Sequence, residues 1–232
     1  DATIPPDRAR FGLPEDAFVF LFVFDFLSFL ERKNPFATLE AFRRAFRPDE
    51  NVVLLFKTVN AEWNAEGAAR MREGAGGWPV RFLGEYLSKR EVAQLMATAD
   101  CYVSLHRGEG FGLTMAEAMA LGKPVIATGY SGNLDFMSPT NSLPVGYRLL
   151  EITEDAGPYA KGMHWADPDV DHAASLMRKV FDDRAFAARV GAQARETMAA
   201  EYGLDAAAGV ARRRLRRILE RVNGPNGESL GL

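Results

Sequence analysis

The sequence predicts an α/β protein built on a doubly wound parallel sheet with helices on both faces. Between residues 17 and 128, short runs rich in β-branched and aromatic residues alternate with helical patterns. These runs are continuously apolar rather than alternating in polarity, which is typical of strands covered on both sides. Strand–helix alternation of this kind produces a parallel sheet between two layers of helices.

Five apolar runs are expected to be strands, at residues 17–26, 51–56, 80–83, 101–104 and 124–128. The first helix should begin at Asn34 and Pro35, an N-cap followed by proline at the first helical position. Its helical pattern continues through residues 36–46.

Two more helices carry boundary signals. Ser88 and Glu91 have the spacing of a capping box, which opens a helix that ends at residue 99. A third helix, over residues 113–121, should end at Gly122.

The pattern loosens after Asn141, where we expect a long loop over residues 154–164 and a short strand near Trp165. Three helices should follow, over residues 171–181, 184–202 and 204–222. Residues 1–222 are therefore expected to form one domain, with residues 223–232 as a flexible tail or linker. Because the chain opens on a loop-like DATIPPDRAR rather than on Met, we also expect a fragment of a longer protein.

Composition excludes several classes of protein. The 232 residues carry a formal net charge of −3, which gives no sign of nucleic-acid binding. A single cysteine, Cys101, rules out a disulfide framework, and three scattered histidines are too few for a structural zinc site. The most apolar stretch, residues 17–30, is interrupted by Asp25 and is too short to span a bilayer. With no signal-peptide core at the start, we expect a cytoplasmic protein.

The loop over residues 106–112 is the first candidate for chemistry. It follows the strand ending near Ser104, and ligands of parallel α/β sheets bind at the carboxyl ends of the strands. Its three glycines allow a close approach of backbone to a ligand, and it leads into a helix N-terminus that suits phosphate. The spacing is not the dinucleotide fingerprint, because Leu113 stands where its third glycine would fall.

Two carboxylates belong to this region, Glu109 in the loop and Glu117 in the apolar helix that follows. An apolar helix is normally buried, and a buried carboxylate is costly without a partner. The sequence leaves three alternatives for Glu117. It binds the hydroxyl groups of a sugar, it pairs with a lysine or arginine, or it faces water.

The Glu109-x7-Glu117 pair lies within GEGFGLTMAEAMALGKPVIAT and resembles the signature of retaining GT-B glycosyltransferases, the large family that includes sucrose synthase and bacterial mannosyltransferases. The resemblance extends to RFGLPEDAFVFLF, to RKNP and to VRFLGEYLSKREVAQLMATADCYVSL, and so covers nearly the whole chain. It implies a Rossmann-like domain that is one half of a GT-B fold.

The resemblance also implies roles for individual residues. Glu109 would bind the transferred sugar, Glu117 the ribose hydroxyls, and Lys33 the diphosphate. Sugar and phosphate would meet the backbone amides of Phe111, Gly112, Leu113 and Thr114. In this family cations replace a metal at the leaving diphosphate, so no metal and no other cofactor is expected.

The chain departs from the family pattern at Ser28, where an arginine usually precedes the lysine by about five residues. Arg32 is a candidate substitute, although a solvated turn is the alternative; Lys57, at the end of a strand, is another candidate cation. His106, Ser131 and Asn133 are candidates for contact with the sugar. The alternative for His106 is a loop histidine with internal hydrogen-bond partners, and the alternative for Ser131 and Asn133 is a plain turn.

Two other signals are discounted. Asp167 and Asp169 match an Asp-x-Asp metal motif of a different glycosyltransferase fold, but they precede a helix, where Asp169 or Asp171 is expected to be a cap. Arginines 212, 213, 214, 216 and 217 form a basic helix that is either a solvated face or a contact with anionic lipid at the inner face of a membrane.

The expected function is donor binding in a retaining glycosyltransferase that moves a sugar from a nucleoside diphosphate sugar to a glycan or lipid-linked glycan. The resemblance implies that the leaving phosphate assists attack on the same face of the sugar. It also implies an N-terminal acceptor domain outside this chain, so the chain alone should transfer no sugar. The alternatives are a nucleotide-sugar epimerase of the GT-B fold and a non-catalytic nucleotide-sugar-binding or assembly domain.

Overall fold

A computed structural model describes residues 4–223 of the chain. Its main sheet has six parallel strands in the order β3-β2-β1-β4-β5-β6. This is the strand order of dinucleotide-binding Rossmann folds, in which the order reverses beside β1. The strands are β1 (Phe18–Asp25), β2 (Val52–Val59), β3 (Val80–Leu83), β4 (Cys101–Ser104), β5 (Val125–Thr128) and β6 (Leu143–Val145). The predicted doubly wound parallel sheet is confirmed.

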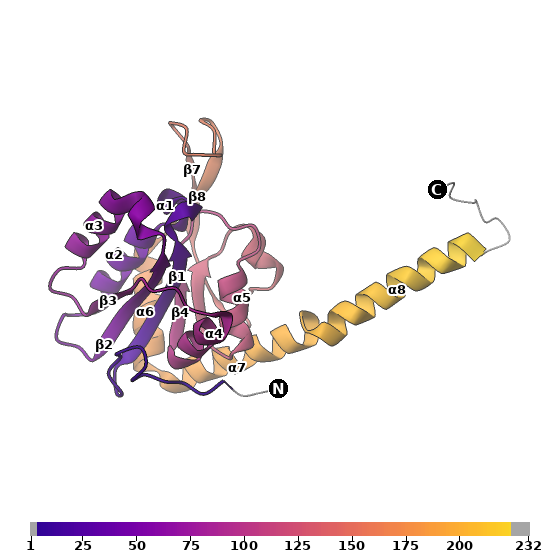
Figure 1. The fold of residues 1–232 in the computed structure, drawn as a ribbon, viewed down its shortest axis with the longest axis horizontal. Coiled ribbons are helices and arrows are strands. Elements are labelled where there is room, and N and C mark those ends of the chain that lie inside the picture. Colours follow the sequence, from indigo (N-terminus) through magenta and orange to yellow (C-terminus); the bar gives the residue numbers. More distant parts are fainter. Residues whose placement is uncertain (1–3, 224–232) are drawn as a thin grey trace.

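Helices cover both faces of this sheet (Figure 1). On one face lie α2 (Pro35–Ala45), α3 (Ala65–Gly74) and α6 (Val170–Asp182), with α2 packed against α6. On the other lie α4 (Lys89–Thr98), α5 (Leu113–Ala120) and α7 (Arg184–Glu201), with α5 packed against α7. The short helix α1 (Leu30–Lys33) follows β1 at the carboxyl edge.

The central strand β1, FVFLFVFD, explains why an unbroken apolar run can be a strand. Its rings on one face meet α2 and α6: the centroid of Phe20 lies 5.6 Å from that of Phe46, and Phe18 lies 5.8 Å from Phe181. Its other face is buried as well, since Val19 and Leu21 are fully buried. Burial on both faces removes any reason for polar alternation.

Most predicted boundaries are confirmed. β3 and β4 have the predicted bounds, and Ser88 and Glu91 form the capping box. β2 runs three residues further than predicted, because Lys57 and Thr58 stay buried and paired with β1. Three methionines are buried in the core: Met96 of α4, and Met115 and Met119 of α5.

The N-cap prediction at Asn34 is right in position and wrong in mechanism. Asn34 precedes Pro35 at the start of α2, but its φ is 53° and its side chain makes no capping hydrogen bond. Its Nδ2 instead donates to the carbonyl oxygen of Leu105, 2.9 Å away. By contrast, Asp169 caps α6 as expected, because its Oδ1 accepts from the backbone of His172.

α3, β6 and most of an antiparallel hairpin were not predicted from the sequence. The hairpin pairs β7 (Tyr147–Glu151) with β8 (His164–Pro168), so the strand expected near Trp165 is confirmed. It projects beyond the carboxyl edge of the sheet, above α1 in Figure 1. β7 is exposed along its whole length and therefore lacks the apolar pattern that marks the other strands.

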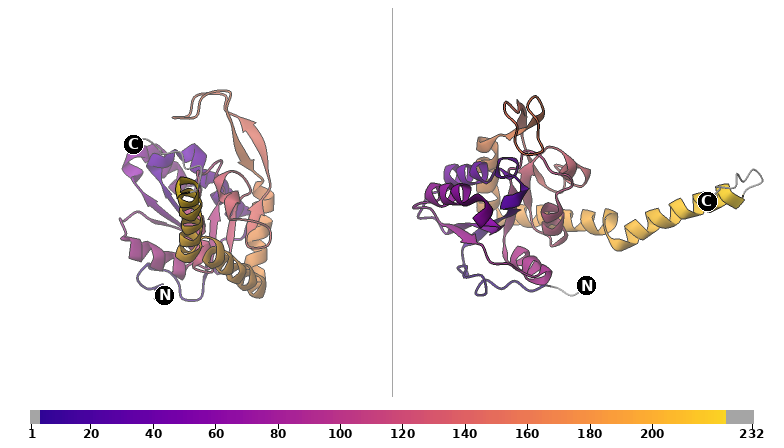
Figure 2. Two further views of the ribbon diagram at one scale, coloured as in Figure 1. Left: turned by 90° about the vertical axis from the view of Figure 1, so that its right-hand side faces the viewer. Right: turned by 45° about the horizontal axis from the view of Figure 1, so that its top comes forward.

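The final helix, α8 (Leu204–Asn223), leaves the domain and extends away from it (Figure 2). Its arginines at 212, 213, 214, 216 and 217 are exposed. The helix bounds agree with the prediction for residues 204–222, whereas the predicted tail beyond Asn223 lies outside the described residues. Within residues 4–223, no helix combines the length and apolar character that crossing a bilayer requires.

We predict that Glu50 stabilises the fold in a pH-dependent way. Its carboxylate accepts two 2.8 Å hydrogen bonds from Arg178 of α6, which lower the pKa of Glu50 to about 2. Because the folded pKa is depressed, the stabilisation is present above the unfolded pKa of about 4.5 and disappears as the pH falls towards 2. Glu50→Gln should lower the free energy of unfolding by about 1–2 kcal/mol at pH 7, with solvent screening included.

Urea unfolding at several pH values measures this. Glu40→Gln is the control, since Glu40 forms an exposed pair with Arg44 on one helix and should matter little. A Glu50→Gln deficit that stayed the same from pH 7 to pH 3 would contradict the prediction.

Candidate functional site

The site begins where β1 ends. α1 is bracketed by two non-glycine residues with left-handed backbone, Phe29 at φ 61° and Asn34 at φ 53°. Such strain persists only when surrounding contacts hold it. Here the backbone of Arg107 donates to the carbonyl of Arg32 over 2.8 Å, and Asn34 is bonded to Leu105. The loop after β4 therefore fixes α1 beside it.

These contacts bring the predicted cations to the predicted loop carboxylate. The ammonium of Lys33 donates to Glu109 Oε1, and Arg32 Nη1 lies 3.3 Å from the same oxygen. Burial by itself would raise the pKa of Glu109, but the charges of Lys33 and Arg32 and the Lys33 hydrogen bond outweigh it, so that pKa lies below its usual value. Arg32 also donates to the carbonyl of Gly108 over 2.9 Å, which makes it part of the site rather than a solvated turn.

A second loop, after β5, touches the Glu109 loop through its backbone. Glu109 N donates to Ser131 Oγ over 2.8 Å, and Gly132 N donates to the Glu109 carbonyl over 3.1 Å. The loops are so close that a Cβ on Gly132 would lie 2.0 Å from the carbonyl oxygen of Gly110. Glycine is therefore required at position 132. Ser131 lies beside Glu109, and its contact with a sugar stays a prediction.

The N-terminus of α5 provides free backbone donors. Gly112 is the N-cap with φ 95°, a conformation that suits glycine. Leu113 and Thr114 are the first two residues of the helix, so their N–H groups have no intrahelical acceptor. The Thr114 hydroxyl is held by the buried hydroxyl of Tyr102, 2.7 Å away.

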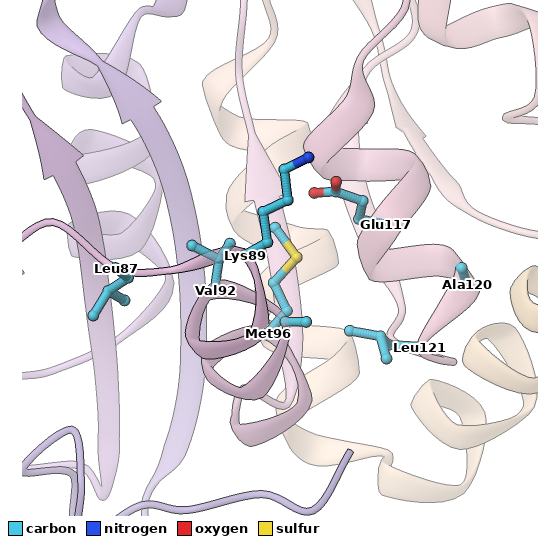
Figure 3. Close-up of a pocket in the computed structure, with 8 residues that line it drawn as sticks. Leu87, Lys89, Val92, Met96, Glu117, Ala120 and Leu121 are labelled. Carbon is cyan, nitrogen blue, oxygen red and sulfur yellow. The ribbon is translucent and has the colours of Figure 1, made fainter. Parts of the chain in front are cut away.

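Three pockets lie around these elements. The first, of about 280 Å³, is lined by Glu109, Arg32 and Ser131 together with aromatic residues of the hairpin region. The second, of about 330 Å³, is lined by Lys33, Lys57 and Thr114. The third, of about 410 Å³, lies between α4 and α5 and is lined by Glu117, Lys89, Leu87, Val92, Ala93, Met96, Ala120 and Leu121 (Figure 3).

The pockets lie next to one another, and we call them a connected series because neighbouring pockets share lining residues or an ion pair. The ion pair of Lys33 with Glu109 joins the second pocket to the first, because each partner lines one of them. Leu87 and Val92 line both the second and the third. The series therefore begins at Glu109, passes the N-terminus of α5 and ends at Glu117.

The side chain of Glu117 is exposed rather than buried with the rest of α5, which agrees with the alternative that it faces water. Leu113, Glu117 and Ala120 form the open face of the helix, whereas its other side contributes to the core. The ammonium of Lys89 points towards the Glu117 carboxylate (Figure 3). The two groups are not among the ion pairs of the described residues. Partial burial raises the pKa of Glu117, and the charge of Lys89 opposes the shift.

Two of the candidates for contact with the sugar, and the ring of Phe111, do not line these three pockets. His106 and Asn133 are fully buried, so neither side chain is placed to touch a ligand in these pockets. Burial lowers the pKa of His106 to about 4, which keeps its ring neutral. The Phe111 ring packs on Phe136, with centroids 4.9 Å apart, so only its backbone remains available.

Several residues that line the first pocket were not predicted from the sequence. Tyr130 follows β5, while Tyr159 and Trp165 belong to the hairpin and pack together with centroids 6.0 Å apart. Arg107 lies with its guanidinium over the Trp165 ring. No local pattern marks these residues, because only the folding of the hairpin over the sheet edge brings them to Glu109.

Comparison with known proteins agrees with this architecture. The profile of the family described as Glycosyl transferases group 1 matches residues 3–197, and the chain belongs to that family. It is 31% identical over 207 residues to a D-inositol 3-phosphate glycosyltransferase of Nocardioides sp., a match that covers 82% of this chain and 39% of that protein. It is 35% identical over 101 residues to a phosphatidyl-myo-inositol mannosyltransferase of Propionibacterium freudenreichii, a match that covers 43% of this chain and 23% of that protein. The chain thus spans about two fifths or less of these relatives.

Solved structures share the fold at lower identity. Anabaena HepE, crystallised with UDP and glucose, superposes with a TM-score of 0.66 at 18% identity. The match covers 90% of this chain and 51% of the HepE chain. The C-terminal domain of the group 1 glycosyl transferase LpcC from Francisella tularensis gives a TM-score of 0.62 at 14% identity, covering 87% and 97%. The expected Rossmann-like fold, shared with domains of GT-B glycosyltransferases, is confirmed.

We predict that Gly132→Ala disrupts the contact between the two site loops. The added Cβ would collide with the backbone of Gly110, which cannot move aside as a flexible side chain would. The free energy of unfolding should fall by roughly 1–3 kcal/mol, the usual cost of overpacking. Gly108→Ala is the matched control, because a Cβ there meets nothing within 4 Å. Chemical denaturation of both variants measures the difference, and equal stabilities would refute the close approach.

Proposed function

We propose that this chain binds the nucleoside diphosphate sugar donor of a retaining glycosyltransferase. The observation that carries the proposal is the connected series of three pockets, with Glu109 at one end, Lys33 and the α5 N-terminus in the middle and Glu117 at the other end. A nucleoside diphosphate sugar has the same linear order of parts: a sugar, a diphosphate, and a ribose with its base.

Each pocket suits the part assigned to it. Carboxylates accept hydrogen bonds from neighbouring hydroxyls, so Glu109 would bind the transferred sugar and Glu117 the ribose. Lys33 and the amides of Leu113 and Thr114 would bind the diphosphate, since ammonium groups and helix N-termini both favour phosphate. Leu87 and Val92 provide apolar surface for the base.

The same groups would assist transfer. As the bond between sugar and diphosphate breaks, negative charge grows on the leaving phosphate, and preorganised cations lower the barrier at that point. Lys33 and Arg32 are held in place by Glu109 before a ligand arrives. We propose that this makes a metal unnecessary, and that the leaving phosphate assists attack on the same face of the sugar.

The acceptor would be a glycan or lipid-linked glycan bound by an N-terminal domain of a longer protein. Transfer requires donor and acceptor to be held in near-attack geometry. We therefore propose that this chain binds the donor and transfers no sugar when isolated.

We predict that the chain binds UDP or GDP without a divalent metal. Isothermal titration of the chain with each nucleotide, in EDTA and then in excess manganese, measures this. Similar affinities in both buffers are expected, because lysine, arginine and backbone amides provide the positive charge. Binding that is abolished by EDTA and restored by manganese would refute metal independence, and no binding in either buffer would refute the proposed function.

We also predict that substitutions of the two glutamates weaken the binding of different parts of the donor. Glu117→Gln should weaken binding of the nucleoside diphosphate itself by roughly 1–3 kcal/mol, because an ionised acceptor of ribose hydroxyls is lost. Glu109→Gln should leave that binding nearly unchanged, because the glutamine amide oxygen can still accept a hydrogen bond from Lys33 and because Lys33 would leave Glu109 when the diphosphate binds. The same change should weaken the additional affinity that comes from the sugar. Glu196→Gln, an exposed helical glutamate away from the pockets, is the control. Titrations with nucleoside diphosphates and with their sugars compare all three, and reversed phenotypes would show that the two assignments are interchanged.

A further inference from the structure

Lys57 is a buried cation that the fold itself does not explain. Its side chain is 3% exposed, and its Nζ donates to the carbonyl oxygen of Thr58 over 3.0 Å. Among the described residues, no carboxylate lies within ion-pair distance of it. Burial lowers the pKa of the Lys57 ammonium, and the more distant charge of Glu85 opposes this shift. A buried charge without a partner is costly, so its presence calls for a ligand.

The register of the sheet places Lys57 on the ligand side. Lys57 pairs with Val23 of β1 and with Leu83 of β3, and paired residues of neighbouring strands project from the same face. Val23 and Lys57 both line the second pocket, opposite Val92 of α4 and Thr114 of α5. The Lys57 side chain therefore belongs to the pocket that also contains Lys33.

The carboxylate of that pocket is already occupied. Asp25 Oδ1 accepts hydrogen bonds from the backbone of Leu27 at 2.9 Å and from Asn60 Nδ2 at 2.8 Å. Lys33, for its part, shares its charge with Glu109. A ligand with two or more negative charges in this pocket thus meets one cation that is partly neutralised and one that has no counter-ion.

A second lysine shows what a structural role looks like in this fold. Lys123 is also withdrawn from solvent, and its Nζ donates to the carbonyl of Ala97 in the last turn of α4. That carbonyl is one of the helix-terminal groups that need an outside donor. Lys123 precedes β5, at the opposite edge of the sheet from the pockets, and Asp100 provides a nearby charge. Lys57 differs in both respects: it donates to the carbonyl of Thr58 within a strand rather than at a helix end, and its charged neighbour Glu85 is itself paired with Arg10.

We propose that Lys57 is a further cation of the diphosphate site, in addition to Lys33 and Arg32, and binds an oxygen of the donor's diphosphate across the pocket from the α5 N-terminus. The inference rests on the proposed function and assigns to that site a residue from the middle of the sheet, distant in sequence from Lys33. Two lysines and the helix amides would then surround the leaving group.

The test compares Lys57→Met with Lys123→Met in calorimetric titrations with UDP and GDP, and with uridine and guanosine. Methionine keeps most of the side-chain length and removes the charge. For Lys57→Met, the Kd of the nucleoside diphosphate should rise roughly 10- to 100-fold, the range of one charge-assisted hydrogen bond. The Kd of the nucleoside should change less than about 3-fold. Lys123→Met should bind both like the wild type, and thermal melts of both variants report whether they fold.

A measurement on the unaltered chain gives an independent test. Addition of inorganic pyrophosphate should shift the NMR signal of the Lys57 side-chain Cε and leave that of Lys123 in place. A Lys57→Met variant that binds UDP and GDP like the wild type, or equal losses for nucleoside and diphosphate, would overturn the proposal, as would a Lys57 signal unmoved by pyrophosphate. A wild-type chain that binds neither nucleotide would overturn the proposed function and this inference with it.

Discussion

The ion pair between Lys33 and Glu109 is the contact on which the arrangement of the site depends. It links the short helix after β1 to the loop after β4, and these two strands are neighbours at the centre of the sheet. Arg32 strengthens the link, and the backbone of Glu109 extends it to Ser131 after β5. Three strand ends are thus joined through one residue, Glu109, which also lines the first pocket.

This pairing also solves an electrostatic problem. Two adjacent cations beside a helix N-terminus would repel one another in the absence of a ligand, and Glu109 offsets that charge. A diphosphate that binds Lys33 offers stronger charge than the carboxylate and would release Glu109 for hydrogen bonds to sugar hydroxyls. The lowered pKa of Glu109 keeps it ionised and ready for that exchange.

The sheet was predictable because its strands and helices carry local signals. Continuous apolar runs, the capping box at Ser88 and the glycine after α5 each act within a few residues. β6 has only three residues, one of them Pro144, and β7 is exposed throughout, so neither has such a signal. Glu109, Lys33 and Arg32 were named as site residues because of the resemblance to a motif, but their ion pairs with one another were not predicted. The hairpin aromatics and the open face around Glu117 depend on packing between distant segments. The choice between the alternatives for His106 and Asn133 could not be made from the sequence for the same reason, since burial of a loop residue is set by its neighbours in space.

A crystal structure of the chain with UDP or GDP tests the central claim most directly. The claim is that one ligand occupies the connected pockets in a fixed order. The ribose should lie beside Glu117, and the diphosphate should meet the amides of Leu113 and Thr114 and the ammonium of Lys33, with its terminal phosphate directed towards Glu109. A nucleotide bound in the reverse order, or at a surface away from the carboxyl edge of the sheet, would contradict the account.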